Sequence, residues 1–173
     1  MKRITNLRRI VLGCAICLVA ITSCKKMDET SARETFDMVA TQKAIDKCNI
    51  AFMEAFNKGD SVGVANCYVS DAKLMPPNVS AKEGKSAIQT EIGSYFKSGI
   101  VKLNIISTGL WGDENMLVEE NKWIISDKDG NELDHGKSLA VYKKEGDSWK
   151  LFRDCFNSDM PCAPASVPAK ENK

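Results

Sequence analysis

Asp154 is the carboxyl group of this sequence that is best placed for acid–base chemistry. It lies in the segment 148–156, where it alternates with Phe152 and Phe156 and so shares their face of an expected strand. If that face lines an interior cavity, burial raises the pKa of the carboxyl and lets it exchange a proton near neutral pH. If the face points outward, Asp154 is an ordinary surface or dimer-contact residue. The sequence leaves both interpretations open.

His135 is the second candidate for catalysis, because it is the only histidine and imidazole titrates near neutral pH. It stands between Asp134 and Gly136 at the start of an expected strand, where a solvated turn residue is the alternative. Tyr68 and Tyr95 could place their hydroxyl groups at the rim of a pocket; the alternative is core packing with a satisfied hydroxyl. We therefore regard Asp154 and His135 as candidate catalytic residues and the two tyrosines as candidate pocket residues.

Large aromatic side chains are the remaining candidates for ligand contact. Trp111, Trp123 and Trp149 fall on three different expected strands, and Trp111 and Trp123 are the two we assign to a pocket. The alternative is that indole rings fill the core or a dimer interface. Glu119 and Glu120 are adjacent, so they point to opposite faces of their strand and at most one can enter a pocket.

No metal or organic cofactor is expected. The sequence has no Cys-x-x-Cys pattern after residue 24 and no cluster of cysteine with histidine, which structural zinc sites use. Its glycines after residue 24 are isolated, so no glycine-rich loop is available to hold a phosphate.

The N-terminus has the pattern of an export signal. Lys2, Arg3, Arg8 and Arg9 precede the apolar residues 10–21, a run too short for the roughly 20 residues that span a bilayer. The following Ile21-Thr22-Ser23-Cys24 resembles the bacterial lipobox, which implies cleavage before Cys24 and lipidation of its thiol. We therefore predict a lipoprotein signal peptide over 1–23 and a polar tether over 24–37. An ordinary cleaved signal and an uncleaved anchor are the alternatives.

This interpretation predicts an exported protein that its lipid anchors to a bacterial membrane. We favour the outer membrane, on its periplasmic or surface side. The whole chain has 24 basic and 23 acidic residues, and removal of the signal takes four of the basic ones, which leaves a mildly acidic domain. Such a charge argues against nucleic acid as a partner.

Four cysteines remain in the exported domain, and an even number in an oxidising compartment allows disulfides. Cys48 and Cys67 lie in apolar helical patterns, which favours buried thiols. Cys155 and Cys162 are seven residues apart across a turn that contains Pro161, so a bridge between them is the other open arrangement.

The apolar periodicity predicts three helices followed by strands. Helices are expected over 38–58, in a short segment from about 60 to 68, and over 84–96; strands are expected over 72–75, 101–111, 116–126, 138–144 and 148–156. Asp-Lys-Asp-Gly-Asn at 127–131 predicts a hairpin turn, and 162–173 has no apolar period and is expected to be disordered. Helices followed by a meander of long strands indicate an α+β domain over 38–161.

Several local phrases, in order, resemble the SnoaL-like branch of the nuclear transport factor 2-like superfamily. They are FMEAFNKGD at 52–60, YVSDA at 68–72, GKSAI at 84–88, WKLFRD at 149–154 and NSD at 157–159. The resemblance implies a cone-shaped fold, in which a curved antiparallel sheet wraps around three N-terminal helices. It also implies an apolar pocket and, frequently, a homodimer formed through the sheet.

The resemblance does not carry the chemistry of the ketosteroid isomerases, which belong to the same superfamily. Their general base is an Asp four residues after an Asp-Ala pair such as Asp71-Ala72, and here that position is Pro76, which cannot accept a proton. Residues 40–58 also lack the tyrosine of the isomerase oxyanion site. We expect a lipid-anchored domain that binds a small apolar or amphipathic ligand. The alternatives are a cofactor-free isomerase or lyase of ketosteroid-isomerase or polyketide-cyclase type that uses Asp154, and a homodimeric assembly module.

Overall fold

The computed structural model describes residues 36–161, which form three helices and one six-stranded sheet. The predicted signal peptide, most of the predicted tether, Cys24 and residues 162–173 lie outside the described residues. The elements in chain order are α1 (Met38–Asn57), α2 (Ser61–Asn66), β1 (Tyr68–Met75), β2 (Lys82–Glu83), α3 (Gly84–Lys97), β3 (Lys102–Gly112), β4 (Met116–Ser126), β5 (Glu132–Glu145) and β6 (Ser148–Ser158).

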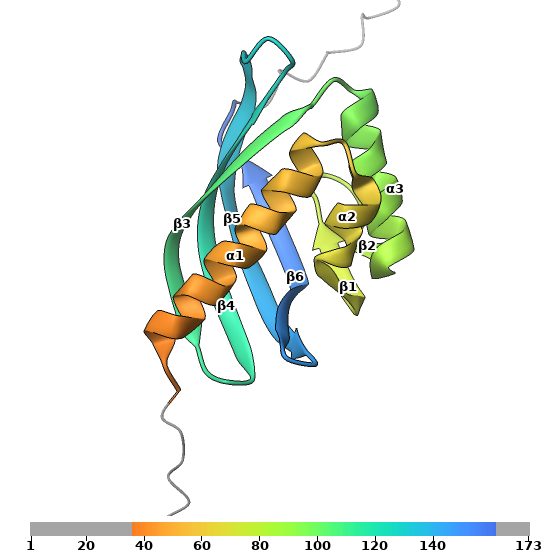
Figure 1. Ribbon diagram of the computed structural model, residues 1–173. Helices are drawn as coiled ribbons and strands as arrows, with labels where there is room; N and C mark the ends of the chain where they lie inside the picture. Colours follow the sequence, from red (N-terminus) through yellow and green to blue (C-terminus); the bar gives the residue numbers. More distant parts are fainter. Residues whose placement is uncertain (1–35, 162–173) are drawn as a thin grey trace, which may run out of the picture. The chain divides into compact units, whose positions relative to one another are not determined.

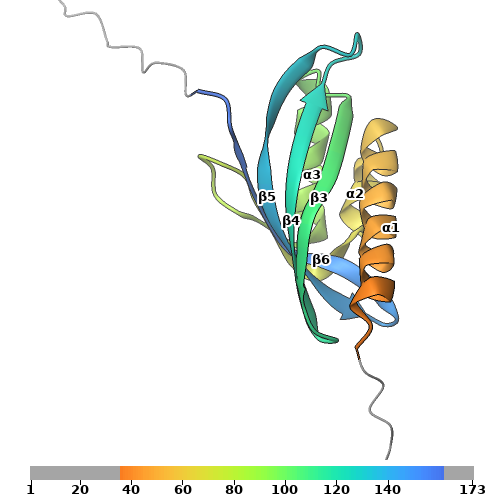
Figure 2. The same cartoon turned by 90° about the vertical axis from the view of Figure 1, so that its left-hand side faces the viewer.

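The sheet has the strand order β2-β1-β6-β5-β4-β3 and is mixed. Strands β3 to β6 form the predicted antiparallel meander, but β1 pairs with β6 in parallel. The expectation of a wholly antiparallel sheet is therefore wrong for this one pair, because the chain leaves β1, passes through α3 and returns to the sheet at its far edge. The α+β class itself is confirmed. Strands β3 to β5 are long and strongly twisted, so the sheet curves (Figures 1 and 2).

Helix α1 lies along the concave face of this sheet, where it packs on β3 and β6 (Figure 1). Its first turn is capped by Asp37, whose carboxylate accepts hydrogen bonds from the amides of Val39 and Ala40 at 2.9 and 3.0 Å. The face that it buries carries Ile45, Phe52 and Phe56, at the helical spacing seen in the sequence. Helix α3 packs on β1 and α2. The opposite face of the sheet, away from α1, is called the outer face below.

Tyr68 lies on a strand rather than on the short helix where the sequence placed it. Helix α2 ends at Asn66, and the carbonyl oxygen of Cys67 accepts a hydrogen bond from the amide of Leu151 at 3.0 Å. That bond draws the chain into register with β6 and starts β1 at Tyr68, which is fully buried. The short apolar run 64–69 is compatible with either element, and the tertiary contact with β6 decides between them.

Strand β3 contains a bulge that changes which side chains face the helices. Ser107 pairs with Asn121 and Gly109 with Glu120, so Thr108 is an extra residue on β3. Before the bulge the odd-numbered Leu103 and Ile105 pack towards the core, and after it Leu110 does so. An inserted residue reverses the alternation of a strand. After Thr108 the even-numbered side chains of β3 therefore face the core and the odd-numbered ones face away from it.

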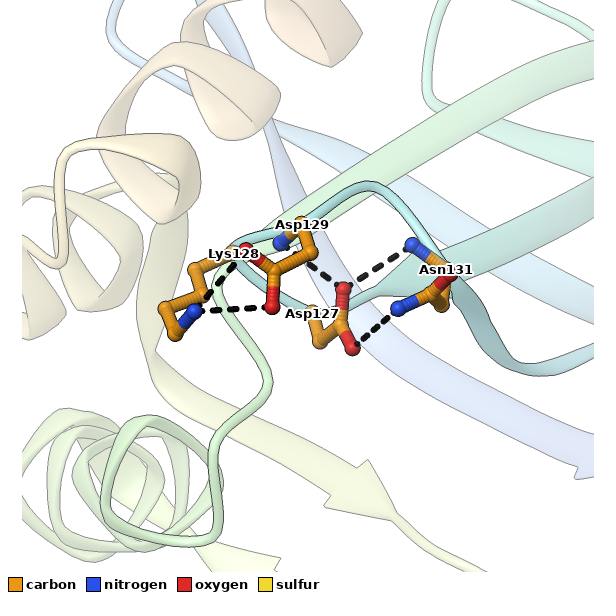
Figure 3. A network of polar contacts seen from close by, with 4 residues as sticks. All are labelled: Asp127, Lys128, Asp129 and Asn131. Atoms are coloured by element: carbon orange, nitrogen blue, oxygen red, sulfur yellow. Dashed lines mark hydrogen bonds and ion pairs between the residues drawn. The ribbon is translucent and has the colours of Figure 1, made fainter.

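The turn between β4 and β5 is held by one carboxylate, as the sequence predicted for residues 127–131 (Figure 3). The Oδ1 atom of Asp127 accepts hydrogen bonds from the amides of Asp129 and Asn131, both at 2.9 Å. Its Oδ2 atom accepts another from the side chain of Asn131, also at 2.9 Å. Gly130 takes a φ of 86°, which a glycine adopts at little cost. This network fixes the register of β4 and β5.

Within the described residues, no helix combines the length and the hydropathy that crossing a bilayer requires. In the part of the chain that the structure describes, Cys48, Cys67 and Cys155 form no disulfide with one another; the first two are half-buried and the third is exposed. Burial raises the pKa of the Cys48 and Cys67 thiols, which keeps them protonated. The predicted bridge from Cys155 to Cys162 involves a residue outside the described range and stays a prediction.

We predict that Gly136→Ala destabilises the domain by about 1–3 kcal/mol, because overpacking a filled interior has that cost. A Cβ atom at position 136 would overlap the carbonyl oxygen of Asn157 and lie 2.6 Å from the Trp123 ring. Gly93→Ala is the matched control: it lies inside α3 with nothing within 4 Å of the new Cβ, so a gain of about 0.5–1 kcal/mol is expected. Chemical denaturation measures both; equal effects of the two substitutions would contradict the packing described here.

Candidate functional site

A cavity of about 340 Å³ lies between the concave face of the sheet and the helices. Its wall is formed by side chains from α1, β1, α3 and strands β3 to β6, and most of them are apolar or aromatic. Representative members are Phe52, Phe56, Tyr95, Ile105, Trp123 and Leu151. Cavities of this size and character are typical of sites for small molecules.

Asp154 is a carboxyl group on the wall of this cavity. It lies on β6, and its Oδ2 atom accepts a hydrogen bond of 2.6 Å from the hydroxyl of Tyr68 on β1. Burial raises the pKa of Asp154 to about 6, although the hydrogen bond from Tyr68 acts in the opposite direction. Burial also raises the pKa of Tyr68 well above its ordinary value, and the nearby carboxylate adds to this effect, so its hydroxyl stays a donor. The pair can therefore exchange a proton at the carboxyl near neutral pH.

The neighbours of Asp154 on β6 differ from the simple alternation expected. Phe156 does share the cavity wall, where its ring meets that of Trp123 edge to face at 5.8 Å. Phe152 does not line the cavity, because β6 is bulged there: Val141 pairs with Arg153 and Tyr142 with Leu151, which leaves Phe152 without a partner on β5. Its ring is instead covered by the guanidinium of Arg153 at 3.6 Å.

A second carboxyl group, Glu119, is fully buried beside the cavity. Its Oε1 atom accepts a hydrogen bond of 2.9 Å from the side-chain amide of Asn49, and its Oε2 atom accepts one of 3.2 Å from that of Asn121. The hydroxyl of Tyr142 lies 2.9 Å from Oε2. Burial and, secondly, Glu119 raise the pKa of Tyr142 well above its ordinary value, which keeps this hydroxyl a donor.

The side chain of Asn121 has an unused acceptor. Its amide nitrogen donates to Glu119, but its Oδ1 atom is buried and has no hydrogen-bond partner among residues 36–161. Asn121 lines the cavity and is only 3 % exposed. Because an unpaired buried polar atom raises the free energy of the fold, this oxygen is a place where a ligand group that donates a hydrogen bond would be stabilised.

Ala140 stands between the two carboxyl-bearing positions. It pairs with Glu119 on β4 and with Asp154 on β6, so three inward positions lie side by side across the sheet. The two outer positions are separated by two strand spacings, which amounts to roughly 10 Å. The small alanine side chain leaves the space over the middle position free.

Three of the four predicted pocket residues line the cavity: Tyr68, Tyr95 and Trp123. The fourth, Trp111, does not, and its side chain is 53 % exposed on the outer face of the sheet. The bulge at Thr108 is the reason, because it reverses which face of the sheet the following side chains point to. Burial raises the pKa of Tyr95. Pro76 also lines the cavity, at the position where the isomerases carry their base.

His135 is not brought together with Asp154. Its neighbour Asp134 lines the cavity, and adjacent residues of a strand point to opposite faces, so His135 faces away. The Nδ1 atom of His135 lies 2.7 Å from the carboxylate of Glu132, which is exposed. The expectation that His135 acts in the same site as Asp154 is thus not supported by its position.

Sequence reasoning missed several polar residues of the cavity wall, among them Asn49, Asn121, Asp134 and Tyr142, and it left the role of Glu119 open. The signal for Glu119 was present, since it alternates with Leu117 and Trp123 on β4 and therefore belongs to the buried face. Asn49 and Tyr142 offered no comparable signal, because only the tertiary fold brings α1 and β5 to Glu119. Among residues 36–161, no group of three or more histidine, cysteine or acidic side chains could hold a metal ion.

Comparison with solved structures shows what this arrangement of elements is similar to. A ketosteroid isomerase-like protein from Erwinia carotovora atroseptica matches at a TM-score of 0.59 and 21 % identity, over 69 % of this chain and 96 % of that one. A protein of unknown function with a cystatin-like fold from Nostoc punctiforme matches at 0.63 and 14 %, over 78 % and 98 %. A putative aromatic ring hydroxylase from Novosphingobium aromaticivorans matches at 0.59 and 17 %, over 71 % and 92 %.

These likenesses show the fold alone, since all of the identities are low. No protein-family model matches the chain. No curated protein matches it either. The fold predicted from the sequence phrases is confirmed by the structural neighbours, which include ketosteroid isomerase-like and nuclear transport factor 2-like proteins.

We predict that Asp154 titrates with a midpoint near pH 6 and that Tyr68→Phe raises this midpoint by about one unit. The phenol hydrogen bond stabilises the ionised carboxylate, so its loss favours the protonated form. Residue-specific NMR titration of the aspartate carboxyl carbons measures both midpoints. Asp113 is an internal control, because hydrogen bonds from the Asn115 and Met116 amides lower its pKa in either protein. A midpoint below pH 4 for Asp154 would contradict its burial in the cavity.

Proposed function

From the nuclear transport factor 2-like fold of this chain, we propose that the domain binds a small apolar or amphipathic molecule. The observation that carries the proposal is the cavity of about 340 Å³, whose apolar and aromatic wall is interrupted by a few inward polar groups. Apolar surface supplies most of the binding free energy in such a site, and the polar groups orient the ligand.

The polar groups support an amphipathic rather than a purely apolar ligand. Asp154 keeps part of its hydrogen-bonding capacity after it accepts from Tyr68, and Asn121 has an acceptor with no partner. Both lie on the cavity wall, on β6 and β4. A hydrocarbon would leave these groups unsatisfied, whereas a ligand with a polar end would pair with them.

Catalysis by Asp154 is the second candidate, and the observation that favours it is the place of this carboxyl on an apolar cavity wall, beside the hydroxyl of Tyr68. A carboxyl that titrates near pH 6 in an apolar cavity can act as a general acid or base for a cofactor-free isomerisation or elimination. Tyr68 would hold the carboxyl in place through its hydrogen bond of 2.6 Å. His135 takes no part in this proposal, because it lies on the other face of β5. Binding without turnover remains the first candidate, since Tyr68 is the only side chain of residues 36–161 that hydrogen-bonds to Asp154, and burial keeps its hydroxyl protonated.

We further propose that the domain is exported and tethered to a bacterial membrane by lipid on Cys24, in line with the lipobox-like residues 21–24. The outer membrane, on its periplasmic or surface side, is the favoured location. A homodimer is supported by exposed apolar side chains on the outer face of the sheet, namely Ile106, Trp111 and Leu139. Nucleic acid is not proposed as a partner, because the domain after residue 23 carries more acidic than basic side chains.

Ala140→Leu is predicted to weaken ligand binding at least tenfold, because the added carbons occupy the space between Glu119 and Asp154. A thermal-shift screen with steroids, polyketide-like aromatic compounds and bile-type acids identifies ligands, and calorimetric titration then compares the variants. Val62→Ala is the matched control, since this apolar side chain is exposed on α2, away from the cavity wall, and its loss should leave affinity unchanged. The absence of any shift in a folded sample would count against ligand binding.

Cys24→Ser is predicted to abolish lipid attachment and to move the protein from the detergent phase to the aqueous phase on Triton X-114 partition. The reason is that serine lacks the thiol to which the lipid is joined. Metabolic labelling with an alkyne fatty acid provides the second readout. Cys155→Ser is the control and should keep the label, because this exposed thiol lies on β6, outside the lipobox-like residues 21–24. Equal labelling of both variants would contradict the proposed anchor.

A further inference from the structure

The charged residues that line the cavity all have the same sign. Asp154, Asp134 and Glu91 contribute carboxylates to the wall, and no lysine, arginine or histidine of residues 36–161 lines it. Glu91 is compensated by Lys82, whose ammonium lies 3.2 Å away. The other two are not: no ion pair within residues 36–161 includes Asp134 or Asp154. The wall therefore carries negative charge without a cation to balance it.

The hydrogen-bond partners of these two carboxylates are neutral. Asp134 accepts from the hydroxyl of Ser158 at 2.6 Å and from the amide of His135 at 2.7 Å, and Asp154 accepts from Tyr68. Behind the wall, Glu119 is likewise held by amide and hydroxyl donors alone and forms no ion pair in the described part of the chain. Asp134 and Asp154 are half-buried and Glu119 is fully buried. Carboxyl groups that are partly or wholly withdrawn from water without a counter-charge raise the free energy of the protein, and a ligand cation would lower it.

The rest of the wall is suited to a cation with an apolar body. Seven aromatic side chains line the cavity, and aromatic ring faces attract ammonium groups. They are Phe52, Phe56, Tyr68, Tyr95, Trp123, Tyr142 and Phe156. Such rings bind the hydrocarbon part of a ligand by burial and its charged end by their quadrupole.

The unpartnered Oδ1 atom of Asn121 adds an acceptor on the same wall. Asn121 pairs with Ser138, two residues from Ala140, which in turn pairs with Asp154. A primary ammonium group has three hydrogens to donate and can use several such acceptors at once, whereas a carboxylate has none. The arrangement thus favours donors and disfavours anions.

We propose that the cavity binds an organic cation, specifically a primary amine carried on an aromatic or alicyclic body. The proposal rests on the binding function proposed above and names the chemical class of its ligand. Neutral alcohols of the same shape should bind more weakly, because they satisfy Asn121 without compensating the carboxylates. Carboxylic acids should bind most weakly, because they bring a second negative charge into a cavity of low dielectric constant.

Three probes of nearly equal shape separate these contributions: 2-naphthylmethylamine, 2-naphthalenemethanol and 2-naphthoic acid. We would titrate each into the full chain in a non-ionic detergent at pH 8 by calorimetry, and subtract titrations into detergent alone. The amine is expected to bind at least tenfold more tightly than the alcohol, and the acid at least tenfold more weakly than the alcohol.

Three variants test which carboxyl group causes the preference for the amine over the alcohol. Asp154→Asn should reduce affinity for the amine at least tenfold and change affinity for the alcohol less than twofold. Asp134→Asn is a second variant of the same kind, in case the first does not fold. Glu120→Gln is the matched control, since this exposed glutamate lies on the outer face beside Glu119 and should change neither affinity.

The outcomes distinguish this proposal from the one it rests on. Binding of the alcohol equal to or tighter than that of the amine overturns the cation proposal and leaves cavity binding in place. Loss of amine affinity in Glu120→Gln equal to that in Asp154→Asn also overturns it, because a general surface charge would then be responsible. Failure of all three probes to bind contradicts both proposals.

Discussion

The parallel pairing of β1 with β6 is the constraint on which the site depends. It begins with the hydrogen bond between the Leu151 amide and the Cys67 carbonyl oxygen, and it sets Leu74 beside Asp154. Because the pairing takes Tyr68 out of a helix and into the sheet, its hydroxyl reaches the carboxylate of Asp154. The same pairing places Tyr68 and Leu74 on the cavity wall. Without it, Asp154 would lie on a sheet edge, where water would hold its pKa near the ordinary value.

The sequence predicted the fold well and the site only in part, for identifiable physical reasons. Helical spacing located α1 and α3, and period-two alternation located β4 and the second half of β5, since these patterns are local. The first half of β5, residues 132–137, was not expected to be a strand. Tyr68 was misplaced because a short apolar segment does not distinguish helix from strand, and its partner on β6 lies 83 residues further along the chain. Trp111 was misplaced because one extra residue, Thr108, reverses the alternation, and no residue type marks a bulge.

The contacts of the buried polar groups also could not be predicted from local sequence patterns, because their hydrogen-bond partners come from distant elements. A glutamate is ordinarily expected to be exposed to solvent. The fold instead encloses Glu119 completely and supplies three neutral donors from α1, β4 and β5. Such a network costs free energy unless every member is paired, and here the Oδ1 atom of Asn121 is not. Many chemistries use one fold, so the fold by itself does not select among them. The balance of charge and unpaired acceptors on the wall is what distinguishes this cavity.

The bulge at Thr108 divides β3 into two halves whose inward and outward positions are offset by one residue. Leu103 and Ile105 in the first half belong to the cavity wall, whereas Trp111 in the second half belongs to the outer face. The outward side chain of Trp111 can therefore change to suit whatever meets the back of the sheet, without disturbing Leu103 and Ile105, which line the cavity. One inserted threonine in this way lets a single strand present odd-numbered side chains to the cavity along one half and to the back of the sheet along the other.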